Sequence, residues 1–133
     1  MKLTTKSEYA LLALIYIARR GNEAYLKLDD ICAHYDIPKK YLEQLFIILK
    51  QNRFIKTRRG ASGGYCLARP AASISLAEII RCLDGALAPT ESVSKYFFAE
   101  TPVSQEKKLI RIFKDIRNYI ATKLESLTLQ ELI

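Results

Sequence analysis

The stretch from Ile37 to Ala68 constrains this chain most, because an amphipathic helix pattern is followed at once by a glycine-rich turn in a strongly basic setting. Between Pro38 and Arg69 there are eight Lys or Arg and one acid, Glu43, so this stretch carries a net charge of +7. The whole 133-residue chain also has a formal charge of +7, so the remainder is neutral overall. A net charge confined to one part of a chain indicates an anionic partner, and nucleic acid fits best.

A helix is predicted from Pro38 to about Gln51, since proline suits the first helical position, where a missing amide is harmless. Its apolar side chains repeat at the i, i+3, i+4, i+7 spacing of a core-facing stripe, namely Leu42, Leu45, Phe46 and Leu49. The opposite face then presents to solvent Lys40, Glu43, Gln44, Ile47 and Gln51.

A shorter helix is predicted just before it, from about Leu28 to Tyr35, and the tight turn between the two is typical of a helix-turn-helix. Two short strands are predicted after it, Phe54 to Arg58 and Tyr65 to Ala68. The turn between these strands, residues 59–64, holds three of the five glycines, which permit positive φ and close backbone approach. This order of helix, helix and basic hairpin predicts a mainly α fold with a small β-hairpin wing.

The flanking regions predict further helices. A capping box at Thr5–Glu8 opens a first helix that is apolar almost all round and therefore needs cover on most sides. A second capping box at Ser75–Glu78 opens a helix that ends near Gly85. We predict a winged helix-turn-helix domain over residues 1–85, followed by an irregular connector over residues 86–103.

The region 104–133 is predicted to be a long dimerisation helix, from about Ser104 to Ser126, and a last turn that starts with a capping box at Thr128–Glu131. The apolar stripe of this helix would lie uncovered in a monomer, which favours a twofold homodimer. The residues predicted at the dimer interface are Leu109, Phe113, Ile116, Ile120 and Leu124.

The exposed side chains of the helix at Pro38–Gln51 are of the types that read DNA bases. Lysine donates to guanine, Gln44 pairs with adenine and Glu43 accepts from cytosine, while Arg58 and Arg59 suit phosphates or a narrow minor groove. The start of the first helix could add a phosphate clamp. The predicted DNA-binding residues are Thr4, Thr5, Lys6, Pro38, Lys39, Lys40, Tyr41, Glu43, Gln44, Arg58, Arg59, Gly60, Ser62, Gly63, Gly64 and Tyr65.

Composition excludes several other classes of protein. Three widely spaced cysteines form no disulfide framework, which favours a reducing cytosol, and half of the residues are hydrophobic, enough for a real core. The longest apolar run, Tyr9 to Ala18, is shorter than the roughly 20 residues that span a bilayer, and the start has no signal-peptide pattern. We therefore expect a cytoplasmic protein without membrane contact.

No nucleotide-binding glycine fingerprint or nucleophile–base pair is evident, so we predict no enzymatic activity.

Several motifs keep one order along nearly the whole chain: Lys2-Leu3-Thr4-Thr5-Lys6, Tyr41-Leu42-Glu43-Gln44-Leu45, Arg58-Arg59-Gly60 with Gly63-Gly64-Tyr65, Leu87-Ala88-Pro89-Thr90-Glu91, and Leu127-Thr128-Leu129. Together they resemble the Rrf2 family of bacterial transcription regulators. The resemblance implies a dimeric winged-helix repressor of a pseudo-palindromic operator in double-stranded DNA. It places the helix at Pro38–Gln51 in the major groove and the wing in the minor groove.

The chain departs from the family members that bind an iron–sulfur cluster. Those members carry three cysteines before the long helix, since thiolates are the ligands that such clusters favour. The first of these cysteines would fall at Ser92 here, and no cysteine follows Cys82. We expect Cys32, Cys66 and Cys82 to be small buried apolar residues and not metal ligands. The chain thus resembles the cluster-free members, with no cofactor and with a regulatory protein or a small molecule as effector.

Two alternatives remain open from the sequence. The chain could be an interaction or sensor module with incidental DNA affinity, in which Tyr96-Phe97-Phe98 forms a docking patch or the wall of a ligand pocket. We favour the simpler interpretation that these rings pack on the dimer core. A redox sensor would need an exposed cysteine of low pKa, and the sequence identifies none.

Overall fold

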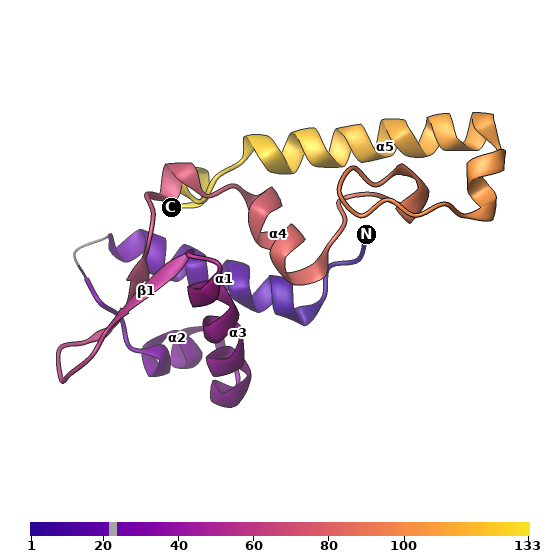
Figure 1. Ribbon diagram of the computed structural model, residues 1–133. Helices are drawn as coiled ribbons and strands as arrows, with labels where there is room; N and C mark the ends of the chain where they lie inside the picture. The colour runs from indigo at the N-terminus through magenta and orange to yellow at the C-terminus, as the bar shows by residue number, and fades with distance from the viewer. Residues whose placement is uncertain (22–23) are drawn as a thin grey trace.

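The computed structural model describes residues 1–21 and 24–133. Its elements follow the order of a winged helix, and residues 107–133 form a long helical arm (Figure 1). The α-helices are α1 (Thr5–Arg20), α2 (Leu28–Tyr35), α3 (Lys39–Gln51), α4 (Leu76–Asp84) and α5 (Lys107–Ser126). The hairpin consists of β1 (Ile55–Arg58) and β2 (Gly64–Leu67), and the 3-10 turns are η1 (Ala71–Ser73), η2 (Glu91–Val93), η3 (Pro102–Gln105) and η4 (Leu129–Leu132). No helix in the described ranges is long and apolar enough to cross a membrane.

Helix α1 lies at the centre of the winged helix, as its apolar sequence predicts. Ala10, Ala13 and Leu14 are fully buried, and α2, α3, α4, β2 and η4 all contact the helix. The small alanines let neighbouring helices approach closely, so the core forms around α1. Gly21 follows the helix as its C-cap residue, and its φ of 78° suits glycine.

Helix α3 packs on this core through the stripe that its periodicity predicted. Leu42, Leu45, Phe46 and Leu49 are buried, and the opposite face is exposed. The two strands after it pair antiparallel, from Ile55 opposite Leu67 to Arg58 opposite Gly64, each within one residue of the predicted bounds. The predicted winged-helix fold is therefore confirmed.

Three predicted helix starts are wrong in detail. Helix α1 has Thr4 and not Thr5 as its N-cap residue, and no side chain caps it. Helix α3 begins at Lys39, with Pro38 outside as the N-cap residue. The long helix α5 begins at Lys107 and not at Ser104, because Thr101 and Ser104 bond to each other and close the separate turn η3. The other two capping boxes, at Ser75 and Thr128, are present.

The chain returns to the core after α5. Thr128 forms a β-bridge with Ser75, and the Leu129 amide donates to the Ile74 carbonyl oxygen at 3.0 Å. Leu129 is fully buried within the same apolar cluster as α1 and α3. The end of the arm is thus anchored to the winged helix, a contact that its sequence did not reveal.

Removing the Leu129 side chain tests this anchor. Because the substitution Leu129→Ala leaves a cavity in the core, we expect it to lower the free energy of unfolding by about 2–5 kcal/mol. Urea denaturation followed by circular dichroism measures the change. The control Ile133→Ala, at a half-exposed position in the same turn, should change stability by no more than about 0.5 kcal/mol. Equal small effects would show that the turn is not part of the core.

Candidate nucleic-acid interface

Helix α3 has an exposed face because its opposite face is buried in the core. Lys40, Glu43, Gln44 and Ile47 are all exposed, so their side chains are free to meet a partner. Donors, acceptors and a methyl-bearing side chain on one helix face are what major-groove recognition requires. These four residues therefore form one exposed surface of α3, which we call the reading face, and its contact with DNA stays a prediction.

The start of α3 is tied to α2. The Lys39 ammonium lies 2.9 Å from the Asp29 carboxylate, and its hydrogen bond to Asp29, with the opposite charge, raises the pKa of Lys39. Both side chains are largely exposed, so the pair contributes little to stability. The pair places the Lys39 ammonium beside α2 at the start of α3.

Two tyrosines predicted to bind DNA take part in packing. Tyr41 is half-buried and meets Tyr9 of α1 edge-on, with ring centroids 5.4 Å apart. Tyr65 is also half-buried and packs edge-on against Phe46 at 4.6 Å. Their rings fasten α3 to α1 and the hairpin to α3, and contact of either with DNA stays a prediction.

The wing rests on the segment before α2, which the sequence did not predict. Leu26 forms a β-bridge with Tyr65, in which each amide donates to the other's carbonyl oxygen at 2.8 Å. Beside this bridge, the Arg58 guanidinium lies 5.6 Å from the centroid of the Tyr25 ring. The Lys27 ammonium donates to the Gly60 carbonyl oxygen at 3.5 Å. The sequence gives little signal here, because Tyr25-Leu26-Lys27 is too short to show the alternation of a strand.

Two wing glycines are required by close backbone approach. A Cβ at Gly63 would collide with the Arg58 carbonyl, and one at Gly64 would collide with the Leu26 carbonyl. Gly64 also has a φ of +149°, which favours glycine. The tip of the wing lies between the end of β1 and Gly63, and its residues Arg59, Gly60 and Ser62 are exposed. The wing therefore presents Arg59 to solvent at its tip.

The start of α1 is engaged within the molecule. The Thr4 amide and hydroxyl donate to the Asp84 carboxylate at 2.8 and 2.6 Å. Partial burial opposes ionisation of Asp84, but the hydroxyls of Ser7 and Thr4, the Thr4 amide and the charge of Lys6 outweigh it and lower the pKa of Asp84. Thr4 therefore links α1 to α4, whereas Thr5 and Lys6 are exposed and available to a phosphate.

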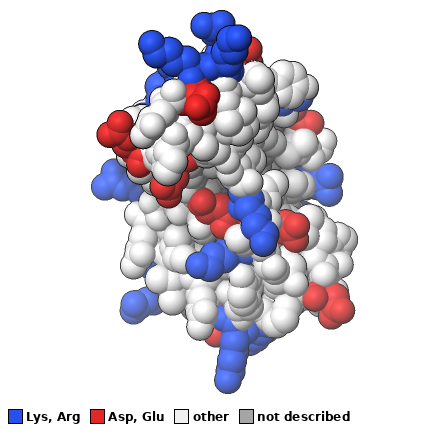
Figure 2. All heavy atoms as spheres, turned by 90° about the vertical axis from the view of Figure 1, so that its right-hand side faces the viewer, with Lys and Arg blue, Asp and Glu red and all other residues white. Residues whose placement is uncertain are grey.

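A second basic surface lies at the end of α3 and the foot of the hairpin. Its groove is lined by Lys50, Arg53, Ile55, Lys56, Thr57, Ala68 and Arg69. Figure 2, which views the end where α5 begins, shows Lys and Arg projecting at the upper and lower ends, and between them Lys and Arg mixed with Asp and Glu. The +7 stretch is therefore divided between the reading face, the wing and this groove.

The thiols do not form a metal site in the described residues. Cys66 is buried, and Cys32 and Cys82 are half-buried on other elements. Burial, then the nearby Asp29 carboxylate, raises the pKa of Cys32, and burial raises the pKa of Cys82. A raised pKa makes the reactive thiolate scarcer, which disfavours the redox-sensor alternative. No group of three or more His, Cys, Asp or Glu that could hold a metal occurs in the described residues.

Comparison with known proteins decides the family. A match to Rrf2, described as an iron-dependent transcriptional regulator, spans residues 3–133. The chain belongs to the Rrf2 family. The HTH-type transcriptional regulator CymR of Bacillus subtilis is 33% identical over 132 residues, covering 99% of this chain and 89% of CymR. The HTH-type transcriptional regulator IscR of Xenorhabdus nematophila is 34% identical over 134 residues, covering 100% of this chain and 79% of IscR.

Solved structures agree with this assignment. The structure of CymR, the global cysteine regulator of B. subtilis, superposes with a TM-score of 0.79 at 30% identity, covering 99% of this chain and 95% of CymR. The protein is thus a transcriptional regulator of the Rrf2 type with a winged-helix fold, and it is not an enzyme. The iron dependence in the family description does not fit the thiols of this Rrf2 protein, because its cysteines lie on three separate elements outside the connector.

The Gly64 contact gives a test of the wing. Gly64→Ala places a Cβ against the Leu26 backbone, so we expect the Leu26–Tyr65 bridge to open at a cost of about 1–3 kcal/mol. Hydrogen exchange of the Leu26 and Tyr65 amides should accelerate. Ser62→Ala, at the exposed tip of the same turn, is the control and should leave both amides protected. Unchanged protection in Gly64→Ala would contradict the close approach.

Proposed function

We propose that this protein is a repressor that binds a pseudo-palindromic DNA operator as a homodimer and works without an iron–sulfur cluster. The exposed polar face of α3, held by a fully buried stripe, is the observation that carries the proposal. Lys40, Glu43 and Gln44 lie on this face and contact base edges, with Pro38, Lys39 and Tyr41 at its N-terminal end.

The wing supplies the second contact. Arg58 and Arg59 reach phosphates or a narrow minor groove, and the amides of Gly60 and Gly64 lie close to the DNA backbone. Gly63 is buried and its amide donates to the Gly60 carbonyl oxygen, so it shapes the turn. The bridge of Leu26 to Tyr65 supports this role, because it stiffens the hairpin that carries these groups. Lys27, beside the Gly60 carbonyl, adds a basic group that the sequence did not single out. Thr5 and Lys6 complete the phosphate contacts from α1.

A homodimer is supported by the outer face of α5. Four large apolar residues on it are exposed at heptad-like spacing, namely Leu109, Ile112, Ile116 and Tyr119. Figure 1 shows the connector and α4 on one side of α5 and nothing on the other. Of the predicted interface residues, Ile120 and Leu124 pack instead against Ala77, Ile80 and Leu87 of their own chain, and Phe113 is half-buried. The proposed interface therefore centres on the four exposed residues, which we call the outer stripe of α5.

The cluster-free state is supported by the connector. Ser92, where a cluster-binding member would have its first cysteine, is buried, and its hydroxyl lies 2.7 Å from the Thr90 hydroxyl. A hydroxyl in this setting is a poor substitute for the thiolate that iron–sulfur clusters prefer. The signal that switches this regulator is accordingly a protein or a small molecule.

Base reading by α3 is tested by the double substitution Lys40→Ala with Gln44→Ala. We expect weaker binding and a loss of about 1–3 kcal/mol of discrimination at the contacted base pairs. Selection of bound sequences from random DNA identifies the operator and its symmetry, and affinities for single-base variants of that operator measure the discrimination. Unchanged specificity would refute base reading by this face.

Arg59→Ala is the matched contrast, because it removes a charge from the exposed wing tip without touching α3. Affinity should fall similarly for all sequences, and the slope of log affinity against log salt should decrease by about one unit per lost phosphate contact. An altered base preference with an unchanged slope would show that the wing reads DNA shape.

The outer stripe of α5 is tested by Ile112→Glu, at a position 55% exposed. A carboxylate at the centre of an apolar interface costs several kcal/mol, so we expect a monomer in sedimentation at micromolar concentration. Arg111→Glu, on the same helix but off the stripe, is the control and should stay dimeric. A dimer in both variants would place the interface elsewhere.

A further inference from the structure

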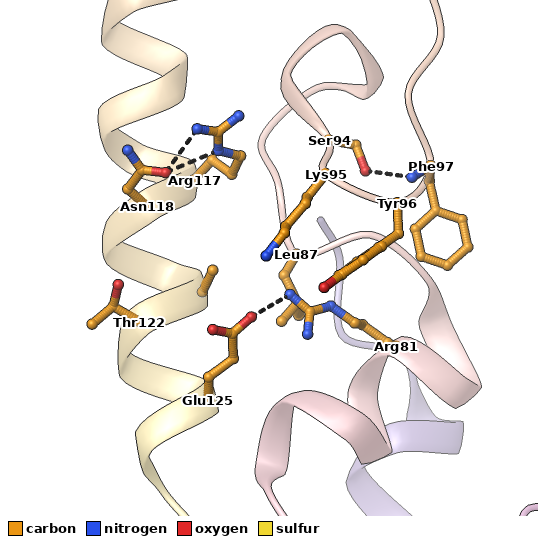
Figure 3. Close-up of a pocket in the computed structure, with 11 residues that line it drawn as sticks. Arg81, Leu87, Ser94, Lys95, Tyr96, Phe97, Arg117, Asn118, Thr122 and Glu125 are labelled. Carbon is orange, nitrogen blue, oxygen red and sulfur yellow. Dashed lines mark hydrogen bonds and ion pairs between the residues drawn. The ribbon is translucent and has the colours of Figure 1, made fainter.

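A cavity of about 410 Å³ lies where α4, the connector and α5 meet (Figure 3). Its walls are Arg81 of α4, Leu87 and residues 94–97 of the connector, and one side of α5 from Arg117 to Glu125. Figure 3 shows Arg81, Lys95, Tyr96 and Glu125 directed toward the same space. A volume of this size lies in the range of small-molecule sites, which are roughly 300–1,000 Å³.

The charges of the cavity do not balance. Arg81 pairs with the Glu125 carboxylate at 2.7 Å, which accounts for the one acid in the lining. Arg117 is half-buried and donates to neutral acceptors, the Val93 carbonyl oxygen at 3.0 Å and the Asn118 side-chain oxygen at 2.8 and 3.0 Å. In the described part of the chain, no carboxylate pairs with Arg117. A half-buried guanidinium that has no opposite charge beside it attracts an anion.

Lys95 adds a second uncompensated charge. Its ammonium lies 5.2 Å from the centroid of the Tyr96 ring and forms no ion pair with a described residue. The guanidinium carbon of Arg81 also lies near this ring, 4.9 Å from its centroid. The lining thus combines two available cations with an aromatic wall and the amide of Asn118.

We propose that this cavity binds a small anionic metabolite, one that carries a carboxylate or a phosphate group. The anionic group lies between Lys95 and Arg117, and the rest of the molecule packs against Tyr96, Leu87 and Ala121. A ligand close to Arg81 also competes with Glu125 for its guanidinium. Binding would therefore alter the ion pair that joins α4 to α5.

This binding does not depend on DNA recognition, although its consequence does. The Arg81–Glu125 pair connects the arm to α4, and α4 holds the start of α1 through Asp84 and Thr4. A ligand that alters the pair is placed to shift the arm relative to the winged helix. Exposed rings at Tyr96 and Phe97, which the sequence assigned to a docking patch, a ligand pocket or a dimer core, are then part of a ligand pocket.

The test is a titration of the 15N-labelled 133-residue chain with sodium phosphate and, separately, sodium succinate, each against sodium chloride at equal ionic strength. We expect saturable NMR shifts confined to the Asn118 side-chain amide and the backbone amides of Lys95 and Ala121. Saturation with phosphate alone or succinate alone identifies the preferred group, and both results support the proposal. Saturation with neither, or shifts centred on α3 and the wing, overturns it.

Variants distinguish anion binding in this cavity from nonspecific attraction of anions to a basic protein. Lys95→Gln and Arg117→Gln should each weaken anion binding about tenfold, the loss expected for one charged hydrogen bond. Lys108→Gln, which removes an exposed charge of α5 outside the cavity, should not. Because Lys95 is exposed, Lys95→Gln should fold and still tests the site if Arg117→Gln fails to fold.

An equal loss in Lys108→Gln would overturn the proposal. So would a Lys95→Gln variant that shifts the monomer–dimer equilibrium in sedimentation while anion binding is unchanged, because the cavity would then belong to the interface. Operator binding is measured on the same samples. Specific DNA binding without anion binding contradicts only this proposal, and anion binding without specific DNA binding contradicts only the proposed function.

Discussion

The burial of α1 is the constraint on which the rest of the structure depends. A helix that is apolar almost all round is stable only when other elements cover it, and α2, α3, α4, β2 and η4 all contact it. The cover has a functional consequence. Because α3 is fixed to α1 by a fully buried stripe and by the Tyr41–Tyr9 contact, its exposed face has one orientation relative to the wing. The reading surface is thus set by the core and not by the surface residues themselves.

Local patterns predicted the elements, and tertiary contacts decided what the patterns left open. The stripe of α3 and the box at Ser75–Glu78 depend on neighbours within one or two turns, so the sequence was sufficient for both. The predicted cap at Thr5 failed because Asp84, 80 residues from Thr4, holds the preceding residue outside the helix. Leu26 escaped prediction for the same reason, since its partner Tyr65 is distant in sequence and the strand it forms is a single bridge.

Helix α5 shows where periodicity is not enough. Its apolar residues cover two adjacent faces, and a spacing of three or four residues fits either. The structure separates them: Ile120 and Leu124 meet α4 and Leu87, while Ile112 and Tyr119 point outward. Sequence alone could not make this division, because it depends on how the connector and η4 rotate the helix about its axis. The dimer prediction mixed the two faces: Leu109 and Ile116 lie on the exposed face, whereas Ile120 and Leu124 lie on the inward one.

Helix α4 connects the arm to the winged helix. Its start lies beside η4 through the Ser75–Thr128 bridge, its last turn pairs with α5 through Arg81 and Glu125, and its end holds α1 through Asp84. In the proposed homodimer, the outer stripe of α5 sets the position of one copy relative to the other. The separation of the two α3 helices, and hence of the two operator half-sites, is then transmitted through α4. A change of about one ångström at the Arg81–Glu125 pair, amplified along the arm, would alter this separation without any change in the reading face itself.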